Sequence, residues 1–122
     1  MEIVYGAMGS SAQQIGGDCP DGWMQMEGER PSIDHTAVEG GLWEITNATI
    51  YAKAAAIELE WRNAEMLFIA DQLLRIEDDD PTALLGTAAQ WRLYRISVRA
   101  WVDGAENFPI PESRPSRPGS AD

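Results

Sequence analysis

The sequence predicts an α+β fold in three parts: a small β-rich lobe over residues 1–47, a helical hairpin over 48–104 and an extended proline-rich tail over 105–122. Three observations lead to this prediction. The first 45 residues combine glycine and serine with only short apolar groups, residues 48–76 contain neither glycine nor proline, and four prolines lie within residues 107–118. Short apolar groups between turn residues are typical of strands, whereas a long stretch without glycine or proline favours a helix.

The predicted β lobe contains short strands at residues 3–7, 23–26 and 41–46. Glycine pairs and prolines separate these strands and supply turn positions. Alternation along the second strand places Met24 and Met26 on one face and their neighbours on the other. We therefore expect one face of this strand to be buried and the other to be open to solvent.

Residues 48–76 are dominated by strong helix formers and predict one long helix. At 1.5 Å per residue this helix would be roughly 43 Å long. Apolar residues at spacings of three and four predict a stripe along it that is long enough to bind a partner helix, and the stripe shifts to a neighbouring line near residues 64–68. The positions are Ile50, Ala54, Ile57, Trp61, Ala64 and Phe68, followed by Met66, Ile69, Leu73 and Ile76.

The aspartate run at residues 78–80 predicts the end of this helix, because carboxylates are unfavourable at a helix C-terminus. After a short turn, Thr87 and Gln90 fit the capping-box pattern at the start of a second helix. This helix is expected to run from residue 88 to 101 or 102 and to fold back on the first one as a hairpin.

The second helix has two distinct faces in the sequence. Large apolar side chains at helical spacing predict the hairpin core, and they are Trp91, Tyr94, Val98 and Trp101. Basic side chains predict a second face, and they are Arg92, Arg95 and Arg99. These arginines are expected to pair with Glu58, Glu65 or Asp71 of the first helix, to meet acidic residues of a partner, or to lie in solvent.

The formal net charge of -11 is unevenly distributed along the chain. It is concentrated in the first 80 residues, while residues 81–122 are close to neutral. Clustered lysine and arginine are needed to contact phosphates, so this charge argues against nucleic acid and anionic membranes as partners. No stretch approaches the roughly 18 apolar residues of a transmembrane helix. We therefore expect a cytoplasmic protein whose partner is another protein.

Catalytic, cofactor and metal sites are not predicted. Cys19 and His35 are the single cysteine and the single histidine, and together they fall short of a zinc site. The aspartate run lacks the spacing of a calcium loop, and no phosphate-loop or nucleophile-elbow signature occurs. The protein is therefore expected not to be an enzyme.

Several motifs follow one another in the order found in a known family. In the second half these are Asp79-Asp80-Pro81, Gly86-Thr87, Trp91-Arg92-Leu93-Tyr94-Arg95-Ile96, Val98-Arg99, Trp101 and the tail from Phe108-Pro109 to Arg117-Pro118. In the first half, Pro20-Asp21-Gly22-Trp23 to Gly28-Glu29-Arg30-Pro31 matches a subgroup. The chain thus resembles the tail fibre assembly chaperones of phages, prophages and R-type pyocin-like particles.

The resemblance implies a protein that binds the distal, C-terminal region of a trimeric tail fibre and assists its folding, trimerisation and attachment. It also implies the cytoplasm of a bacterial host, with or without later retention on the particle, and no cofactor. Two other functions remain open from the residues: a tail adaptor subunit that forms homo-oligomers through the long helix, and an acidic DNA mimic that inhibits a nucleic-acid enzyme.

Candidate partner-binding residues follow from side-chain chemistry. Methionine suits adaptable surfaces, tryptophan is enriched at interface hot spots, and arginines on an extended tail suit a docking strap. The predicted contact residues are Trp23, Met24, Met26, Trp43, Arg114 and Arg117.

Overall fold

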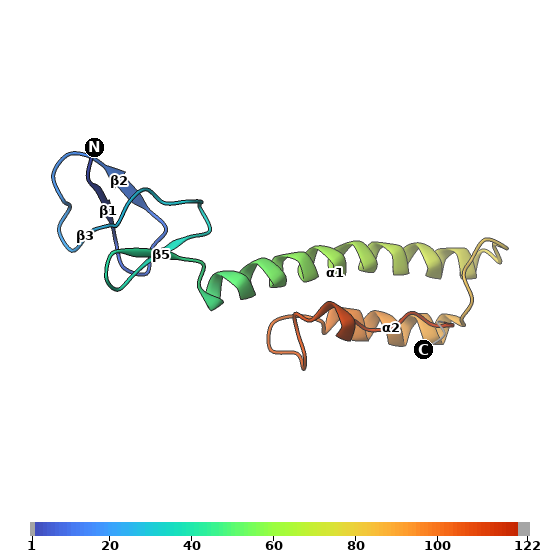
Figure 1. Cartoon of the computed structure of the whole chain (residues 1–122). Helices are drawn as coiled ribbons and strands as arrows, with labels where there is room; N and C mark the ends of the chain where they lie inside the picture. Colours follow the sequence, from blue (N-terminus) through green and yellow to red (C-terminus); the bar gives the residue numbers. More distant parts are fainter. Residues whose placement is uncertain (1, 120–122) are drawn as a thin grey trace. The chain divides into compact units, whose positions relative to one another are not determined.

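The computed structural model describes residues 2–119, which form two compact units, one ending at Ile50 and the other beginning at Tyr51. The first unit holds all the strands, and the second holds two antiparallel helices and the tail (Figure 1). The predicted α+β class, with a small β region followed by a long and a second helix, is confirmed.

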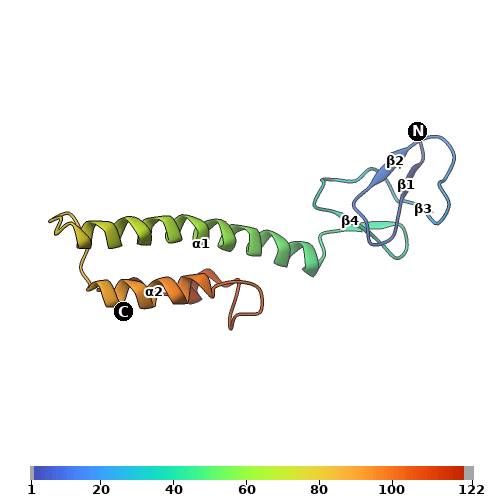
Figure 2. The same cartoon turned by 180° about the vertical axis from the view of Figure 1, so that it is seen from behind.

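The first unit contains two small antiparallel sheets. One has the order β2-β1-β3, with β1 at Val4–Gly6, β2 at Gln13–Ile15 and β3 at Met24–Gln25. The other pairs β4 at Thr36–Val38 with β5 at Leu42–Glu44. Strand β5 is labelled in Figure 1 and β4 in Figure 2. The sequence predicted β1, β3 and β5 and missed β2 and β4, both of three residues.

The core of the first unit is small and joins both sheets. Val4, Met26 and Ala37 are buried, and Met24 and Trp43 pack against them. Backbone hydrogen bonds also join the sheets, since Gly9 N donates to Ala37 O at 2.9 Å. A core of this size leaves little apolar surface to hold the unit together, so its turns carry part of the stability.

Helix α1 spans Asn47–Glu77, one residue longer at each end than predicted. Thr46 precedes it, and its Oγ1 accepts a hydrogen bond from Thr49 N at 3.2 Å, which satisfies one of the free N–H groups of the first turn. The long helix predicted from the absence of glycine and proline is therefore confirmed.

Helix α2 spans Ala88–Arg99 and begins with the predicted capping box. Gln90 N donates to Thr87 Oγ1, and Thr87 N donates to Gln90 Oε1. The helix ends at Arg99, with Ala100 as its C-cap, two to three residues before the predicted end. A short 3-10 helix, η1, follows at Pro111–Ser113.

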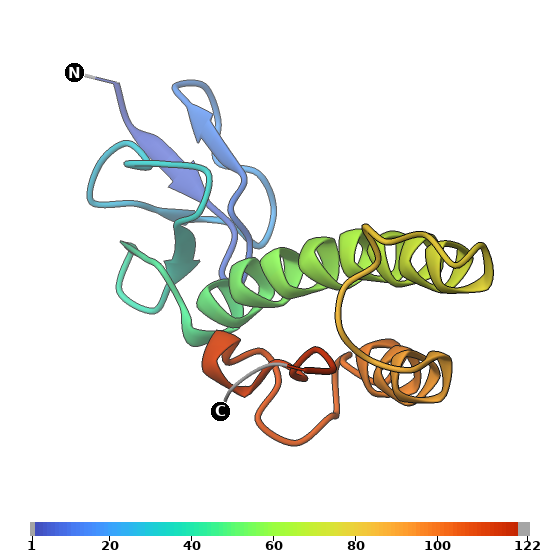
Figure 3. The same cartoon turned by 90° about the vertical axis from the view of Figure 1, so that its right-hand side faces the viewer.

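The second unit is a hairpin with the tail folded back onto it. Figures 1 and 2 show α2 running beside α1 in the opposite direction, and the tail returning alongside α2. The view turned by 90° shows the tail beside the two helices (Figure 3). The buried centre is formed by Ile69, Trp91, Tyr94 and Val98, with Trp61, Met66, Phe68, Leu73 and Ile76 packed around it.

The predicted aromatic face of α2 is buried, and Trp101 joins it at 4% exposure. The predicted apolar stripe of α1 is only partly right, because Ile50 and Ile57 are exposed. Instead, the line of α1 that faces the hairpin interior includes the buried polar residues Glu58 and Glu65. Neither helix, nor any other described helix, is long and apolar enough to cross a membrane.

Candidate functional site

A line of buried polar side chains runs along α1. Glu58, Glu65 and Gln72 are spaced seven residues apart, which places them on one face of the helix. They are 1%, 5% and 4% exposed. Gln72 Oε1 accepts a hydrogen bond from Leu84 N at 2.9 Å. Buried carboxylates are costly unless they are paired, so each glutamate needs a cation or several donors.

Arg114 of the tail supplies the cation for Glu58. Its Nε and Nη2 donate to the two carboxylate oxygens at 2.6 and 2.7 Å. Trp101 Nε1 donates a third hydrogen bond at 3.1 Å. The guanidinium also lies over the Trp61 ring, 4.8 Å from its centroid. This combination of a bidentate ion pair and a cation–π contact is specific to arginine.

Arg117 makes the same arrangement one step further along. Its Nε and Nη2 donate to Glu65 at 2.7 Å each, and the Tyr94 hydroxyl donates to the same carboxylate. Its guanidinium lies 4.0 Å from the centroid of the Phe68 ring. The second unit therefore holds its tail in two equivalent sockets, each made of a glutamate, an aromatic ring and a hydrogen-bond donor from the α2 segment.

The repeat lengths of the tail and helix explain why two sockets fit. Seven residues of α-helix rise roughly 10.5 Å, and three residues of polyproline II rise roughly 9.3 Å. Arg114 has φ -57° and ψ 144°, within the polyproline II region. The distance between arginines three residues apart in such a tail therefore nearly matches the distance between glutamates seven residues apart on the helix. Arg114 and Arg117, predicted as contacts to a partner, thus bind glutamates of the same chain in this structure.

The sockets shift the acidity of their members. Hydrogen bonds from Arg114 hold the pKa of Glu58 below its ordinary value, against the opposing effect of burial. Burial has the largest influence on Glu65 and raises its pKa, but the hydrogen bonds from Arg117 and Tyr94 and the Arg117 charge outweigh it, so the pKa is lowered. Burial, and then the hydrogen bond to Glu65, raise the pKa of Tyr94.

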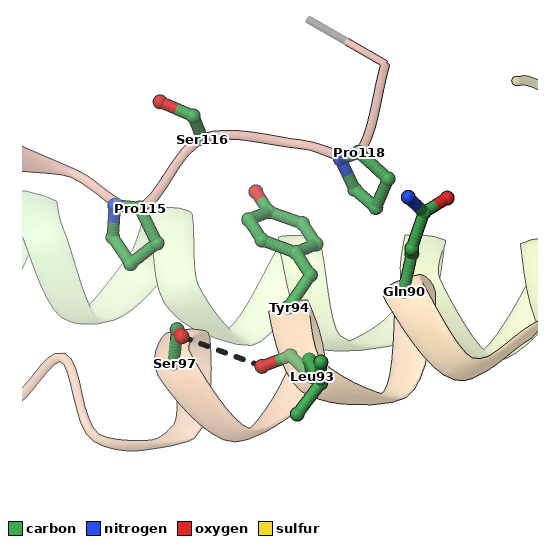
Figure 4. Close-up of a pocket in the computed structure, with 7 residues that line it drawn as sticks. All are labelled: Gln90, Leu93, Tyr94, Ser97, Pro115, Ser116 and Pro118. Atoms are coloured by element: carbon green, nitrogen blue, oxygen red, sulfur yellow. Dashed lines mark hydrogen bonds between the residues drawn. The ribbon is translucent and has the colours of Figure 1, made fainter. Parts of the chain in front are cut away.

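A groove of about 340 Å³ lies between α2 and the tail. Tyr94 stands between the two walls, with the α2 residues on one side and the tail on the other (Figure 4). The lining residues are Gln90, Leu93, Tyr94, Ser97, Pro115, Ser116 and Pro118. Each arginine of the tail reaches α1 while the proline that follows it lines this groove.

The outer face of α2 is apolar and uncovered. Leu93 is 66% exposed and Ile96 is 56% exposed. Ala89 and Ala100 are also exposed and complete a line with spacings of four, three and four. Because the opposite face of α2 forms the hairpin core, this short helix is apolar on two sides.

The arginines of α2 do not make the predicted pairs with the first helix. Glu58 and Glu65 bind the tail instead, and Asp71 pairs with Arg75 at 2.7 Å. Among residues 2–119, no carboxylate forms an ion pair with the arginines at positions 92, 95 and 99. The cause is geometric, because these arginines flank the interface while the glutamates point into it.

The candidate residues of the first unit differ in accessibility. Met26 is 4% exposed and belongs to the core, so it is not part of a surface that a partner can reach. Met24 and Trp43 are half-buried and pack on that core, and the Trp43 indole donates to Gly28 O at 2.9 Å. Trp23 is half-buried outside the core cluster. A partner contact by Trp23 stays a prediction.

The described part of the chain offers no arrangement for metal binding, since no group of three or more His, Cys, Asp and Glu side chains converges there. Cys19 is exposed. His35 Nδ1 lies 2.8 Å from Ser32 Oγ in a turn. No family model, curated protein or solved structure matches this chain. What the protein does must therefore follow from its own residues.

Proposed function

We propose that this protein is a tail fibre assembly chaperone. It binds the C-terminal region of a trimeric phage or phage-tail-like fibre and assists folding, trimerisation and attachment. It acts by binding and carries out no chemistry, in the cytoplasm of the bacterial host. The proposal needs a rigid scaffold with apolar surface left over for a partner.

The observation that supports the proposal best concerns the second unit, whose tail is fixed to α1 by buried ion pairs while its outer surface carries exposed apolar side chains. The two sockets tie the tail to α1, so the charged interior is internally satisfied. On the outside, Leu93 and Ile96 of α2 remain exposed. Contiguous exposed apolar side chains on a small protein are characteristic of surfaces that bind other proteins.

The motifs behind the family resemblance have structural roles that fit this proposal. Trp91 and Tyr94 hold α2 against α1, and the arginine-proline repeat forms the strap. Fixing the strap and hairpin in this way presents the outer face of α2 on a rigid support. A rigid binding surface loses less conformational entropy on association.

The folding of tail fibres explains why such a surface would be needed. Their chains pair strands over long distances in sequence and between subunits, and folds of this kind form slowly. Unpaired strand edges and apolar surface are prone to aggregation in the meantime. A chaperone that covers apolar surface on each fibre chain keeps it soluble until three chains meet.

The test is co-expression with the fibre protein encoded beside this chain. We expect soluble, SDS-resistant fibre trimer to increase strongly with the chaperone present, and the two proteins to co-purify on a tag. An unrelated acidic protein of similar size, expressed at the same level, is the control. Equal amounts of trimer with and without the chaperone, and no co-purification, would refute the proposal.

A second candidate is a tail adaptor subunit that oligomerises through α1. It is favoured by exposed apolar residues that repeat every seven positions, Ile50 with Ile57 and Leu67 with Leu74. This function predicts stable self-association of the purified protein without any fibre. Light scattering that shows a monomer at tens of micromolar would exclude it.

A further inference from the structure

The outer face of α2 combines an apolar line with a row of arginines. Ala89, Leu93, Ile96 and Ala100 form the line, which extends for three helical turns. The arginines at 92, 95 and 99 are spaced three and four residues apart, so they form a parallel row along one edge of it. The face is therefore amphipathic in its own right, separately from the buried face.

These arginines are unusual in a chain with a net charge of -11. Of the other arginines, Arg75, Arg114 and Arg117 each bind a carboxylate. Arg30 and Arg62 instead donate to backbone carbonyl oxygens. The row on α2 has no such partner within the described residues, and Nε of Arg95 is buried without a hydrogen-bond partner. Arg92 and Arg99 are exposed, so their guanidiniums are open to a carboxylate supplied by another protein.

The other edge of the apolar line opens into the groove beside the tail. Leu93 belongs to both the line and the groove wall, so the two are continuous. Tyr94 closes the groove on the inside, and Pro115 and Pro118 form its far wall (Figure 4). An apolar side chain of a partner that lies on α2 can enter this groove at Leu93.

We propose that the outer face of α2, with the adjoining groove, binds an acidic amphipathic helix of a partner protein. The partner's apolar residues at i, i+3, i+4 and i+7 would lie on Leu93 and Ile96, and its aspartates or glutamates would pair with the arginine row. This rests on the proposed function, and it assigns the contact with the fibre, or with a segment preceding its distal domain, to α2.

Charge complementarity selects this occupant over a second copy of the chain. Antiparallel α2 helices from two copies would bring their arginine rows to the same side of the contact, where like charges repel. In a parallel pair the rows would lie apart, but α2 contains no acidic residue to pair with either of them. An acidic helix meets the row with opposite charge. Screening at physiological salt limits electrostatic effects to about 8 Å, so this local row outweighs the distant acidic residues of the chain.

The experiment measures the affinity of the full chain for two labelled 18-residue peptides by fluorescence anisotropy at 150 mM salt. Both peptides have leucine at helical spacing, one with glutamate and the other with lysine on the flanks. We expect the glutamate peptide to bind at least tenfold more tightly. Leu93→Asp should weaken it at least tenfold, whereas Leu74→Asp, at a similarly exposed site on α1, should leave it unchanged.

Charge reversal gives a second, independent readout. The double variant Arg92→Glu and Arg99→Glu should reverse the preference, so that the lysine peptide binds more tightly. Both positions are exposed, and the circular dichroism of each variant at 222 nm confirms that the helices are intact. A wild-type preference for the lysine peptide, or glutamate-peptide binding that is insensitive to Leu93→Asp, would overturn the inference.

Self-association identifies the competing occupant. If the wild-type protein is a dimer by light scattering and Leu93→Asp makes it a monomer, a second copy covers this face and the inference is wrong. The trimer assay separates this failure from that of the proposed function. If the amount of fibre trimer rises equally with the wild type and with Leu93→Asp, the proposed chaperone function stands and the assignment of the fibre contact to α2 is wrong.

Discussion

Replacing Arg114 by leucine leaves the Glu58 carboxylate buried in the hairpin with one of its three hydrogen bonds, the one from Trp101. Removing one partner of a buried ion pair costs about 3–5 kcal/mol. The Arg114 side chain is 28% exposed, so water can partly replace it and the lower end, about 3 kcal/mol, is expected. For a domain of this size that corresponds to a fall in Tm of roughly 12–24 °C.

Circular dichroism at 222 nm during thermal unfolding is the assay, because every helix that contributes substantially to this signal lies in residues 47–99. The double variant Glu58→Leu with Arg114→Leu completes the cycle. Replacing both members of a buried pair by apolar residues is often neutral, so the double variant should recover most of the lost stability. Asp71→Ala, which breaks an exposed pair, serves as the control and should change Tm far less.

A double variant as unstable as Arg114→Leu alone would contradict the assignment of this loss to the Glu58 carboxylate. That result would mean that the loss comes from the tail or from packing on Trp61, and not from an unpaired carboxylate. A fall as small as that of Asp71→Ala would show that the Arg114 socket contributes no more than a surface pair.

The remaining predictions concern pH, capping and the first unit. The pKa values of Glu58 and Glu65 are lowered in the folded state. The stability that these two carboxylates contribute is therefore complete above their unfolded pKa of about 4.3 and is lost as pH falls through their folded pKa values. The Tm of the wild type should drop more steeply below pH 4 than the Tm of the double variant Glu58→Gln, Glu65→Gln. Thr87→Ala removes the capping box and should cost about 1 kcal/mol in urea unfolding; no change would show that the cap is dispensable. Gly41→Ala should destabilise the first unit alone, because Gly41 has φ 75° and an added Cβ would lie 2.5 Å from Gln25 O. Hydrogen exchange should then accelerate in residues 2–46 and not in 51–119, and uniform acceleration would contradict this.

Local rules in the sequence predicted the helices accurately. The absence of glycine and proline defined α1 to within a residue at each end, and Thr87 with Gln90 located the start of α2. Helical spacing also identified Trp91 and Val98 as core residues. These features depend on neighbours within a few residues, which a sequence pattern records directly.

Long-range pairing explains what the sequence did not predict. Strands β2 and β4 have three residues each, and partners across the sheet, not their own composition, define them. The tail arginines lie 52 and 56 residues from their glutamates, so local patterns do not reveal the pairing. Of the alternatives for the α2 arginines, the pairing with the first helix is wrong. The sequence did contain a signal for the pairing of the glutamates with the tail. Glu58 and Glu65 lie seven residues apart in α1, and the arginine-proline pair of the tail is likewise repeated.

A photo-crosslinking side chain at position 93, in cells that co-express the neighbouring fibre protein, reports directly whether α2 contacts the fibre. We expect a crosslink to the fibre chain from position 93 of α2 and none from position 67 of α1, although Leu67 is the more exposed of the two, at 76% against 66%. Absence of a fibre crosslink from position 93, while the protein is folded and the fibre still forms soluble trimers, would contradict this expectation.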